Sequence, residues 1–262
     1  MGTVETDELK RPGHIEPAEW ALRVELAACY RVFDWLGWTE NIFNHITVRV
    51  PGAERHFLIN PFGLWYDEVT ASNLVKIDLA GNPVVPSPYP PNPAGFIIHS
   101  AIHAAREDAH CVIHTHTTTG LAVACKQRGL SHGNFYGAML AGRVAYHDFE
   151  GITTREDEKP RLVASLGDRH VLVLRNHGLL VCERDVATAF ALMWTLQRAC
   201  DVQVATESMG GADIPLSREV CDASAYARDH FEADGRTCHR MFEGAVRRME
   251  RSRGPHWIDY RT

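Results

Sequence analysis

The sequence predicts an α/β fold in which a mixed β-sheet lies between layers of helices. Segments with apolar residues at helical spacing alternate along the chain with short β-branched or alternating runs, the order typical of α/β proteins. Turn signals such as Ala80-Gly81-Asn82 add hairpins, so antiparallel pairs belong to the same sheet. No repeat or change of composition divides the chain. We therefore expect one domain over residues 16–252, between tails over residues 1–15 and 253–262.

The first part of the chain is predicted to begin with a helix and to continue with strands. Residues 16–36 carry a broad apolar stripe at helical spacing, with Pro17 in the first turn and Gly37 at the end. Alternating or β-branched runs, separated by turn residues, then predict strands over residues 45–50, 56–59, 74–79 and 83–85. Five prolines between positions 86 and 93 exclude a helix or an inner strand, so a stiff connector is expected there.

Helices and strands alternate in the second part of the chain. Apolar runs that end at polar residues predict strands over residues 111–116, 144–147 and 171–174. Apolar residues at helical spacing predict helices over residues 96–106, 117–127, 156–166 and 185–209. Asp185 is a suitable N-cap for the last of these, and Gly210-Gly211 interrupts it. A single polar helix is expected after that, over residues 223–251.

Composition and charge exclude several classes of protein. Hydrophobic residues make up 45% of the chain and charged residues 23%, the balance of an ordinary folded protein. The net charge of −6 and the absence of a Lys/Arg-rich run argue against a nucleic-acid partner. No apolar leader and no run of about 18 apolar residues is present, so we expect no membrane partner. The seven cysteines are scattered and lack CxxC spacing, which favours a reducing, cytoplasmic location over a disulfide framework.

Two of the fifteen histidines, His99 and His103, stand one helical turn apart. A pair at this spacing binds zinc in metalloproteases, but that pattern places a Glu after the first His, and here the segment reads HSAIH. We therefore expect both imidazoles to pack inside the protein rather than to bind metal.

Three other histidines stand where two predicted strands end. His114 and His116 are two residues apart at the end of an apolar strand, so their imidazoles point to the same face. His177 follows the strand over residues 171–174, and Gly178 allows the chain to turn tightly after it. Three imidazoles brought together with open coordination positions are the ligand set of a catalytic metal site.

These two motifs, His114-Thr115-His116 and Asn176-His177-Gly178, resemble in order and separation the metal motifs of the class II aldolase/adducin family. Residues 44–49 and 60–63 resemble two substrate loops of that family, and the resemblance covers about residues 19–203. It implies a three-layer α/β/α fold with a largely antiparallel central sheet. It also implies a homotetramer with active sites between subunits, and one divalent metal ion per chain on the three histidines. Zn(II) is expected first, with Fe(II) and Mn(II) as alternatives. The substrate-binding residues that it implies are Asn44, Asn60, Phe62, Gly63 and Gly95.

The sequence departs from the sugar-phosphate aldolases of the family at the site itself. Gly95 stands where those enzymes have a Glu that serves as metal ligand and general acid/base. His45 stands in place of a phosphate-binding Asn, Phe62 lies in a loop that otherwise carries hydroxyl groups, and Pro93 and Ala94 replace two Ser. Because these changes remove hydrogen-bond donors for an anion, we expect the substrate to lack a phosphate.

The resemblance and its departures together imply a lyase. The expected reaction is cleavage of a C–C bond through a metal-stabilised enolate, in a small non-phosphorylated carbonyl or hydroxy acid. Metal-bound imidazoles cannot act as free bases, so Tyr136, His45 or Asp148 is expected to carry the proton.

Two other functions stay open. One is a non-haem iron oxygenase or decarboxylase on an aryl keto acid, which is implied by resemblance to a bacterial branch of the family related to an enzyme of aminocoumarin biosynthesis. Three imidazoles with open positions can hold Fe(II) as well as Zn(II). Aromatic side chains that would suit such a substrate are Phe62, Trp65, Tyr66, Phe135 and Tyr136. The other is a non-catalytic binding module like that of adducin.

Overall fold

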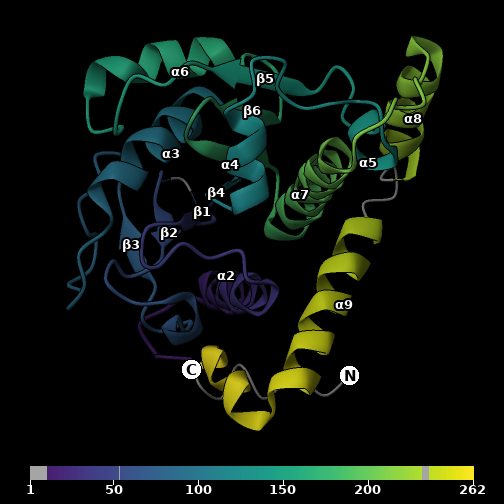
Figure 1. Cartoon of the computed structure of the whole chain (residues 1–262). Helices are drawn as coiled ribbons and strands as arrows, with labels where there is room; N and C mark the ends of the chain where they lie inside the picture. The colour runs from purple at the N-terminus through teal and green to yellow at the C-terminus, as the bar shows by residue number, and fades with distance from the viewer. Residues whose placement is uncertain (1–10, 53, 232–235) are drawn as a thin grey trace.

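A seven-stranded sheet forms the centre of the computed structural model, which describes residues 11–52, 54–231 and 236–262 (Figure 1). The strand order is β3-β2-β1-β4-β7-β6-β5. β5 and β6 pair in parallel, and all the other neighbours are antiparallel. The predicted mixed, largely antiparallel sheet between helix layers is thus confirmed. The strands are β1 (His45–Arg49), β2 (Phe57–Ile59), β3 (Val75–Ile77), β4 (Cys111–Thr115), β5 (Val144–His147), β6 (Val171–Leu174) and β7 (Gly178–Glu183).

Each face of the sheet is apolar and covered by helices, because alternate residues of a strand point to opposite faces. Cys111 and Ile113 pack with residues of α2 (Pro17–Leu36), α4 (Thr118–Ala124), α7 (Val186–Met209) and α9 (Arg236–Arg253). Val112, between them, packs with residues of α3 (Pro93–Ala105) and α6 (Lys159–Leu166) on the opposite face. The central strands are therefore buried on both sides.

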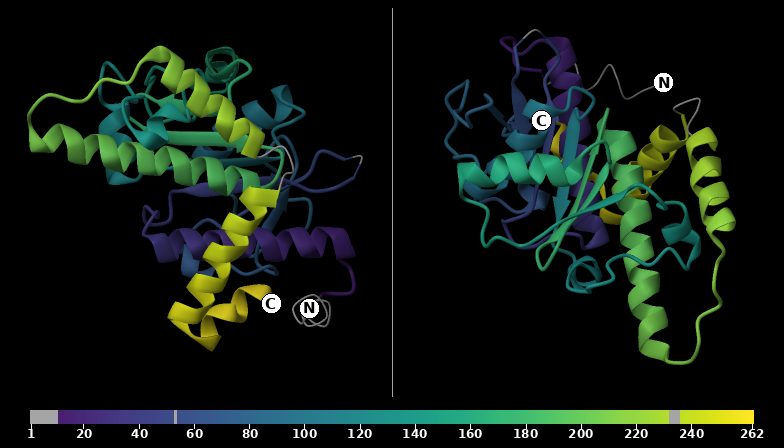
Figure 2. Two further views of the ribbon diagram at one scale, coloured as in Figure 1. Left: turned by 90° about the vertical axis from the view of Figure 1, so that its right-hand side faces the viewer. Right: turned by 90° about the horizontal axis from the view of Figure 1, so that it is seen from above.

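The C-terminal part of the chain differs from the prediction. In place of one helix over residues 223–251 there are two, α8 (Arg218–Phe231) and α9, and the residues between them lie outside the described ranges. α7 is capped as expected, since the Asp185 carboxylate accepts a hydrogen bond from the Thr188 amide at 2.7 Å. Its C-terminal half extends beyond the sheet, and α8 returns beside the short helix α5 (Phe135–Ala138) (Figure 2).

One predicted strand is absent, and one observed strand was not predicted. Residues 83–85 form no strand, only a single bridge between Ile77 and Pro83. The central strand β7 was missed, although it pairs with both β4 and β6. Short 3-10 helices also occur, η1 (Tyr66–Glu68) and η2 (Glu156–Glu158).

The end of the chain, predicted to be a tail, packs on the domain. η3 (Pro255–Arg261) lies against α2, and its Tyr260 is fully buried. The Tyr260 carbonyl oxygen accepts a hydrogen bond from the Ala71 amide at 2.8 Å, and Asp259 lies 3.0 Å from Arg31. Of the tail predicted at the other end, residues 1–10 lie outside the described ranges, and Ile15 packs against Trp20. No helix among the described residues is long and apolar enough to cross a membrane.

Candidate metal centre

The three histidines of the two motifs meet at one edge of the sheet. His114 lies on β4, His116 follows that strand, and His177 lies in the tight turn between β6 and β7. The end of this turn needs glycine at position 178, because a Cβ atom there would lie 2.4 Å from the Thr115 carbonyl oxygen. Antiparallel pairing of β4 with β7 then brings His177 next to the end of β4. The predicted clustering of the three imidazoles is what the structure shows.

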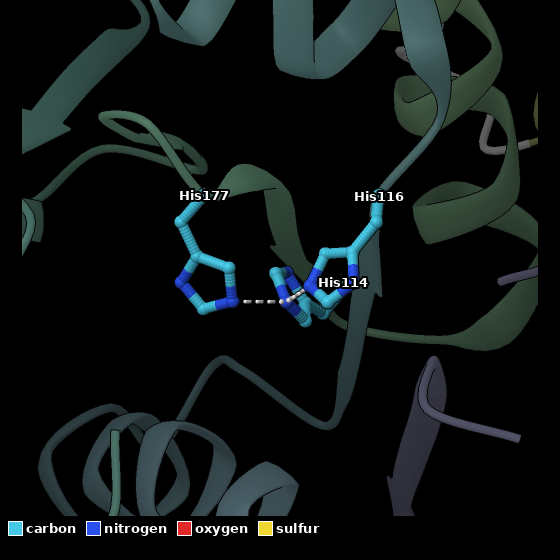
Figure 3. A group of neighbouring side chains, drawn as sticks. All are labelled: His114, His116 and His177. Carbon is cyan, nitrogen blue, oxygen red and sulfur yellow. Dashed lines mark hydrogen bonds between the residues drawn. The ribbon is translucent and has the colours of Figure 1, made fainter. Parts of the chain in front are cut away.

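The Nε2 atoms of the three rings converge (Figure 3). The His114 Nε2 atom lies 2.8 Å from that of His116 and 3.3 Å from that of His177. His114 Nδ1 lies 2.9 Å from the Leu179 carbonyl oxygen, so it donates its N–H there and its Nε2 lone pair points at the other two rings. Nitrogens that bind one tetrahedral zinc ion lie about 3.3 Å apart. This donor set fits a divalent cation.

Burial keeps these imidazoles in the neutral form that binds metal. It lowers the pKa of His114 well below the usual value, and the nearby His116 and His177 lower it further. Burial, followed by the charge of His116, lowers the pKa of His177 to about 4, and burial also lowers that of His116. At neutral pH all three rings therefore present free lone pairs.

A cavity of about 720 Å³ opens onto the three histidines. Among the described residues that line it there is no Lys or Arg. Its apolar side chains come from several loops and helices: Phe43, Phe62, Ile98, Leu121, Phe149 and Ile152. Apart from the histidines, its polar side chains are the acidic Glu40 and the uncharged Asn92, Thr153, Thr154 and Asn176. The cavity therefore offers a cation site at one end, an apolar wall, and no cationic side chain for a phosphate.

The His45 ring occupies the space in which a side chain at position 95 would begin. A Cβ atom on Gly95 would lie 2.5 to 2.6 Å from the Cε1, Nδ1 and Nε2 atoms of the His45 ring. His45 Nδ1 donates to the Phe43 carbonyl oxygen at 3.2 Å, which leaves Nε2 as an acceptor. That Nε2 atom is buried and has no hydrogen-bond partner among the described residues. Burial lowers the pKa of His45 to about 4.

His99 and His103 are buried structural residues, as expected. The Thr47 hydroxyl lies 2.6 Å from His99 Nδ1 and 2.7 Å from His103 Nε2, and His103 Nδ1 donates to the Ala109 carbonyl oxygen at 2.8 Å. The Thr47 hydroxyl therefore donates to His103 and accepts from His99. The His99 ring lies 4.3 Å from the His45 ring between centroids, so this group of side chains supports His45 from behind.

The other residues predicted for the site fall into two groups. Phe62 and Gly95 line the cavity. Asn44 and Asn60 are buried beside it and support loops, since Asn44 Nδ2 donates to the Trp38 carbonyl oxygen and Asn60 Oδ1 accepts from Tyr30. The residues that do not line the cavity of their own chain are Asn44, Asn60, Gly63, Tyr136 and Asp148.

Tyr136 lies on α5, where its ring faces the Arg198 guanidinium at 5.6 Å. Asp148 is exposed and lies 3.4 Å from Arg175. Of the aromatic residues suggested for substrate contact, Phe62 lines the cavity. Tyr66 is buried in the core, and Trp65 and Phe135 are exposed outside the cavity. Phe43, Phe149 and Ile152 also line the cavity, and sequence reasoning missed them because isolated apolar residues in loops form no periodic pattern.

Known proteins resemble this chain over most of its length. The family model described as the class II aldolase and adducin N-terminal domain matches residues 24–204. The chain is similar to the alpha-adducin of Rattus norvegicus, with 47% identity over 76% of this chain and 27% of that protein. It is also similar to a crystal structure of an aldolase II superfamily protein from Pseudomonas syringae, with 44% identity, a TM-score of 0.87, and 95% and 98% of the two chains covered. An L-fuculose 1-phosphate aldolase structure from Glaciozyma antarctica matches over 100% of both chains, with 25% identity and a TM-score of 0.82.

Proposed function

This chain belongs to the class II aldolase and adducin family, and from that premise we propose that it is a metal-dependent lyase. The proposed substrate is a small, non-phosphorylated hydroxy acid or hydroxy carbonyl compound, and the proposed reaction is cleavage of its C–C bond. The observation that carries this proposal is the convergence of three neutral imidazoles in a cavity that has no Lys or Arg among its described lining residues.

One divalent ion per chain would be held by His114, His116 and His177, with Zn(II) as the proposed metal and Fe(II) or Mn(II) as alternatives. When bound, such an ion polarises a carbonyl group and stabilises the negative charge of an enolate. Because the three imidazoles are its ligands, another residue has to move the proton.

We assign this proton transfer to His45. Its Nε2 lone pair takes the proton of the substrate hydroxyl, the adjacent C–C bond breaks, and the hydroxyl carbon becomes a carbonyl. The electron pair of the broken bond forms the enolate, and the same proton then returns to the enolate carbon, which leaves His45 neutral again. Position and free lone pair support this role, since the ring occupies the space beside Gly95 and its Nε2 has no other partner among the described residues.

Tyr136, the other candidate for this role, lies outside the cavity of its own chain. It could act only in the cavity of a neighbouring copy, which would agree with a homotetramer that has active sites between subunits. The tetramer and a cytoplasmic location, without nucleic acid as a partner, remain proposals from the family resemblance and the composition.

The test combines metal content with turnover. We expect one metal per chain in anaerobically purified protein, and aldehyde release from a panel of non-phosphorylated hydroxy acids. His45→Asn should keep the metal and lose roughly 10²–10⁴-fold in turnover, the usual contribution of a positioned base. His110→Asn, which changes an exposed imidazole, is the matched control. Full turnover in His45→Asn would exclude the proposed role of His45.

The iron-dependent alternative has one observation in its favour, the aromatic side chains of the cavity wall. It predicts iron in the elemental analysis and oxygen consumption with aryl keto acids. A binding module of the adducin kind predicts neither turnover nor oxygen consumption with any compound of these panels.

A further inference from the structure

A second cavity, of about 300 Å³, lies beside the edge strand β3 and the beginning of α2. Residues 85–89, in the connector that precedes α3, form part of its wall. None of the described residues lines both this cavity and the one at the three histidines. Its volume lies at the lower end of the range of small-molecule sites. The two cavities are therefore separate places in the fold.

Three charged side chains line this second cavity: Glu19 and Arg23 of α2 and Lys76 of β3. The Glu19 carboxylate accepts a hydrogen bond from Arg23 Nε at 2.9 Å and another from Lys76 Nζ at 2.8 Å. Burial raises the pKa of Glu19, but these two hydrogen bonds outweigh it and hold the pKa below its usual value. Glu19 is therefore ionised at neutral pH. Two positive charges and one negative charge leave the cavity with a net charge of +1.

The Arg23 guanidinium is buried, and one of its nitrogen atoms lacks a partner. Nε donates to Glu19, and Nη1 donates to the Ala71 and Leu74 carbonyl oxygens at 3.1 and 2.8 Å. Nη2 forms no hydrogen bond with a described residue and is not enclosed by protein atoms, so it opens into the cavity that Arg23 lines. A buried cationic group is stabilised when its N–H groups have acceptors. The cavity thus presents charged N–H donors that a ligand with acceptor oxygens would satisfy.

The rest of the lining decides between kinds of anion. Several lining side chains beside the charged group are apolar: Ile15, Leu74, Val85, Pro86 and Pro88. A phosphate group carries more than one negative charge at neutral pH, and it would face the Glu19 carboxylate. A carboxylate carries a single negative charge, which matches the net charge of the cavity, and its oxygens accept hydrogen bonds from cationic N–H groups. The apolar side chains then suit a short hydrocarbon body.

We propose that this cavity is a binding site for a small organic monocarboxylate. The carboxylate oxygens accept hydrogen bonds from Arg23 Nη2 and Lys76 Nζ, and the apolar part of the ligand lies against residues 85–88. The site is independent of the metal centre and of the reaction proposed there, so each can fail without the other.

The test is calorimetric titration of the full chain with 3-methylbutanoate, with its neutral amide 3-methylbutanamide, and with inorganic phosphate. We expect saturable binding of 3-methylbutanoate with a dissociation constant on the order of 1 mM, and binding at least about tenfold weaker for the other two probes. Equal affinity for the carboxylate and the amide, tighter binding of phosphate, or no saturable binding of the carboxylate would each overturn the proposal.

A charge at the rim locates the site without disturbing the core. Val85 lines the cavity and is 44% exposed, so Val85→Glu should fold normally, and its negative charge should weaken 3-methylbutanoate binding about fivefold. Val84→Glu is the matched control, because Val84 is 40% exposed but does not line the cavity. It should change the affinity less than about twofold. Equal losses of affinity in the two variants would contradict the site.

Lys76→Met removes one of the two proposed donors and should weaken binding at least about tenfold. Lys159→Met is its control, since Lys159 lies 2.7 Å from Glu156 and its side chain is 23% exposed, against 19% for Lys76, but it lies outside the cavity. Carboxylates also bind divalent metal ions, so the same titration is made with His177→Ala, which should keep full affinity. Binding that survives in Lys76→Met and disappears in His177→Ala would place the carboxylate at the metal centre and overturn the inference.

Discussion

Gly95 and His45 should be coupled in stability, because the imidazole occupies the space that any side chain at position 95 would need. A Cβ atom at position 95 would lie 2.5 Å from the His45 ring, and normal contacts begin near 3.4 Å. The ring cannot easily retreat, since the His99 ring lies 4.3 Å and the His114 ring 5.3 Å away between centroids. Gly95→Ala is therefore an overpacking change, which typically costs about 1–3 kcal/mol.

The sign of the effect should reverse once His45 is removed. Gly95 lies in the first turn of α3 and has no positive φ, so alanine is compatible with its backbone. In a His45→Ala background the clash disappears, and the better helix propensity of alanine should leave Gly95→Ala neutral or stabilising by up to about 1 kcal/mol. The expected coupling between the two positions is about 2 kcal/mol.

The assay is urea unfolding of the four proteins of this double-mutant cycle, after metal removal with a chelator. Gly244→Ala in α9 is the matched control, because the atom nearest to its added Cβ would be 3.8 Å away, on Arg247. It should stabilise both backgrounds by the same few tenths to about 1 kcal/mol. If Gly95→Ala changes the free energy of unfolding equally in both backgrounds, within about 0.5 kcal/mol, the steric reasoning is refuted.

Four further predictions follow from the site and the packing around it. Wild type should not cleave fuculose-, rhamnulose- or ribulose-phosphates, and wild-type turnover near one per second would contradict this prediction. A gain of activity should need His45→Asn together with Gly95→Glu, since Gly95→Glu alone has no room for the new side chain. His177→Ala should abolish tight metal binding, because two imidazoles make a weak site, and stoichiometric metal in that variant by elemental analysis would exclude the assignment. Light scattering at micromolar concentration should give the mass of a tetramer, and a monomeric mass would count against sites shared between subunits. Burial lowers the pKa of His103 to about 3 in the folded state, so this imidazole takes up a proton only on unfolding. As the pH falls below about 6.5, this proton uptake should cost metal-free protein about 1.4 kcal/mol of stability per pH unit. Urea unfolding should show a shallower pH dependence in His103→Gln, and an unchanged slope would argue against the role of His103.

Patterns that repeat along the chain were sufficient for much of the fold. Helical spacing located α2, α3, α6 and α7, and β-branched runs located β1, β4, β5 and β6, within a few residues of their observed ends. The clustering of the three histidines was predictable for the same reason. Residues two apart on a strand share a face, so His114 and His116 had to point together. His177 joins them because it stands directly before β7, the strand that pairs with β4.

Local patterns failed where an element depends on its neighbours. β7 has an apolar run over residues 179–182, but it follows the His177 turn without a break, and only its pairing with β4 and β6 shows it to be a separate central strand. The last residues look like a polar tail, and their order comes from contacts of Tyr260 and Asp259 with residues near the beginning of the domain. Contacts of this kind have no periodic signal.

The amino-acid sequence by itself thus determined the fold class and the three histidines of the candidate metal centre, and its resemblance to the sugar-phosphate aldolases showed that Gly95 stands where those enzymes have a Glu carboxylate. Only the tertiary structure decided what takes the place of that carboxylate and what surrounds the site. His45 and Gly95 are neighbours because β1 pairs with β4 and α3 begins beside them. Phe43, Phe62 and Phe149 line the same cavity because β1 begins, and β2 and β5 end, on the same side of the sheet. The physical reason is that side-chain periodicity reports which face a residue occupies, whereas the order of strands in the sheet determines which distant residues share a cavity.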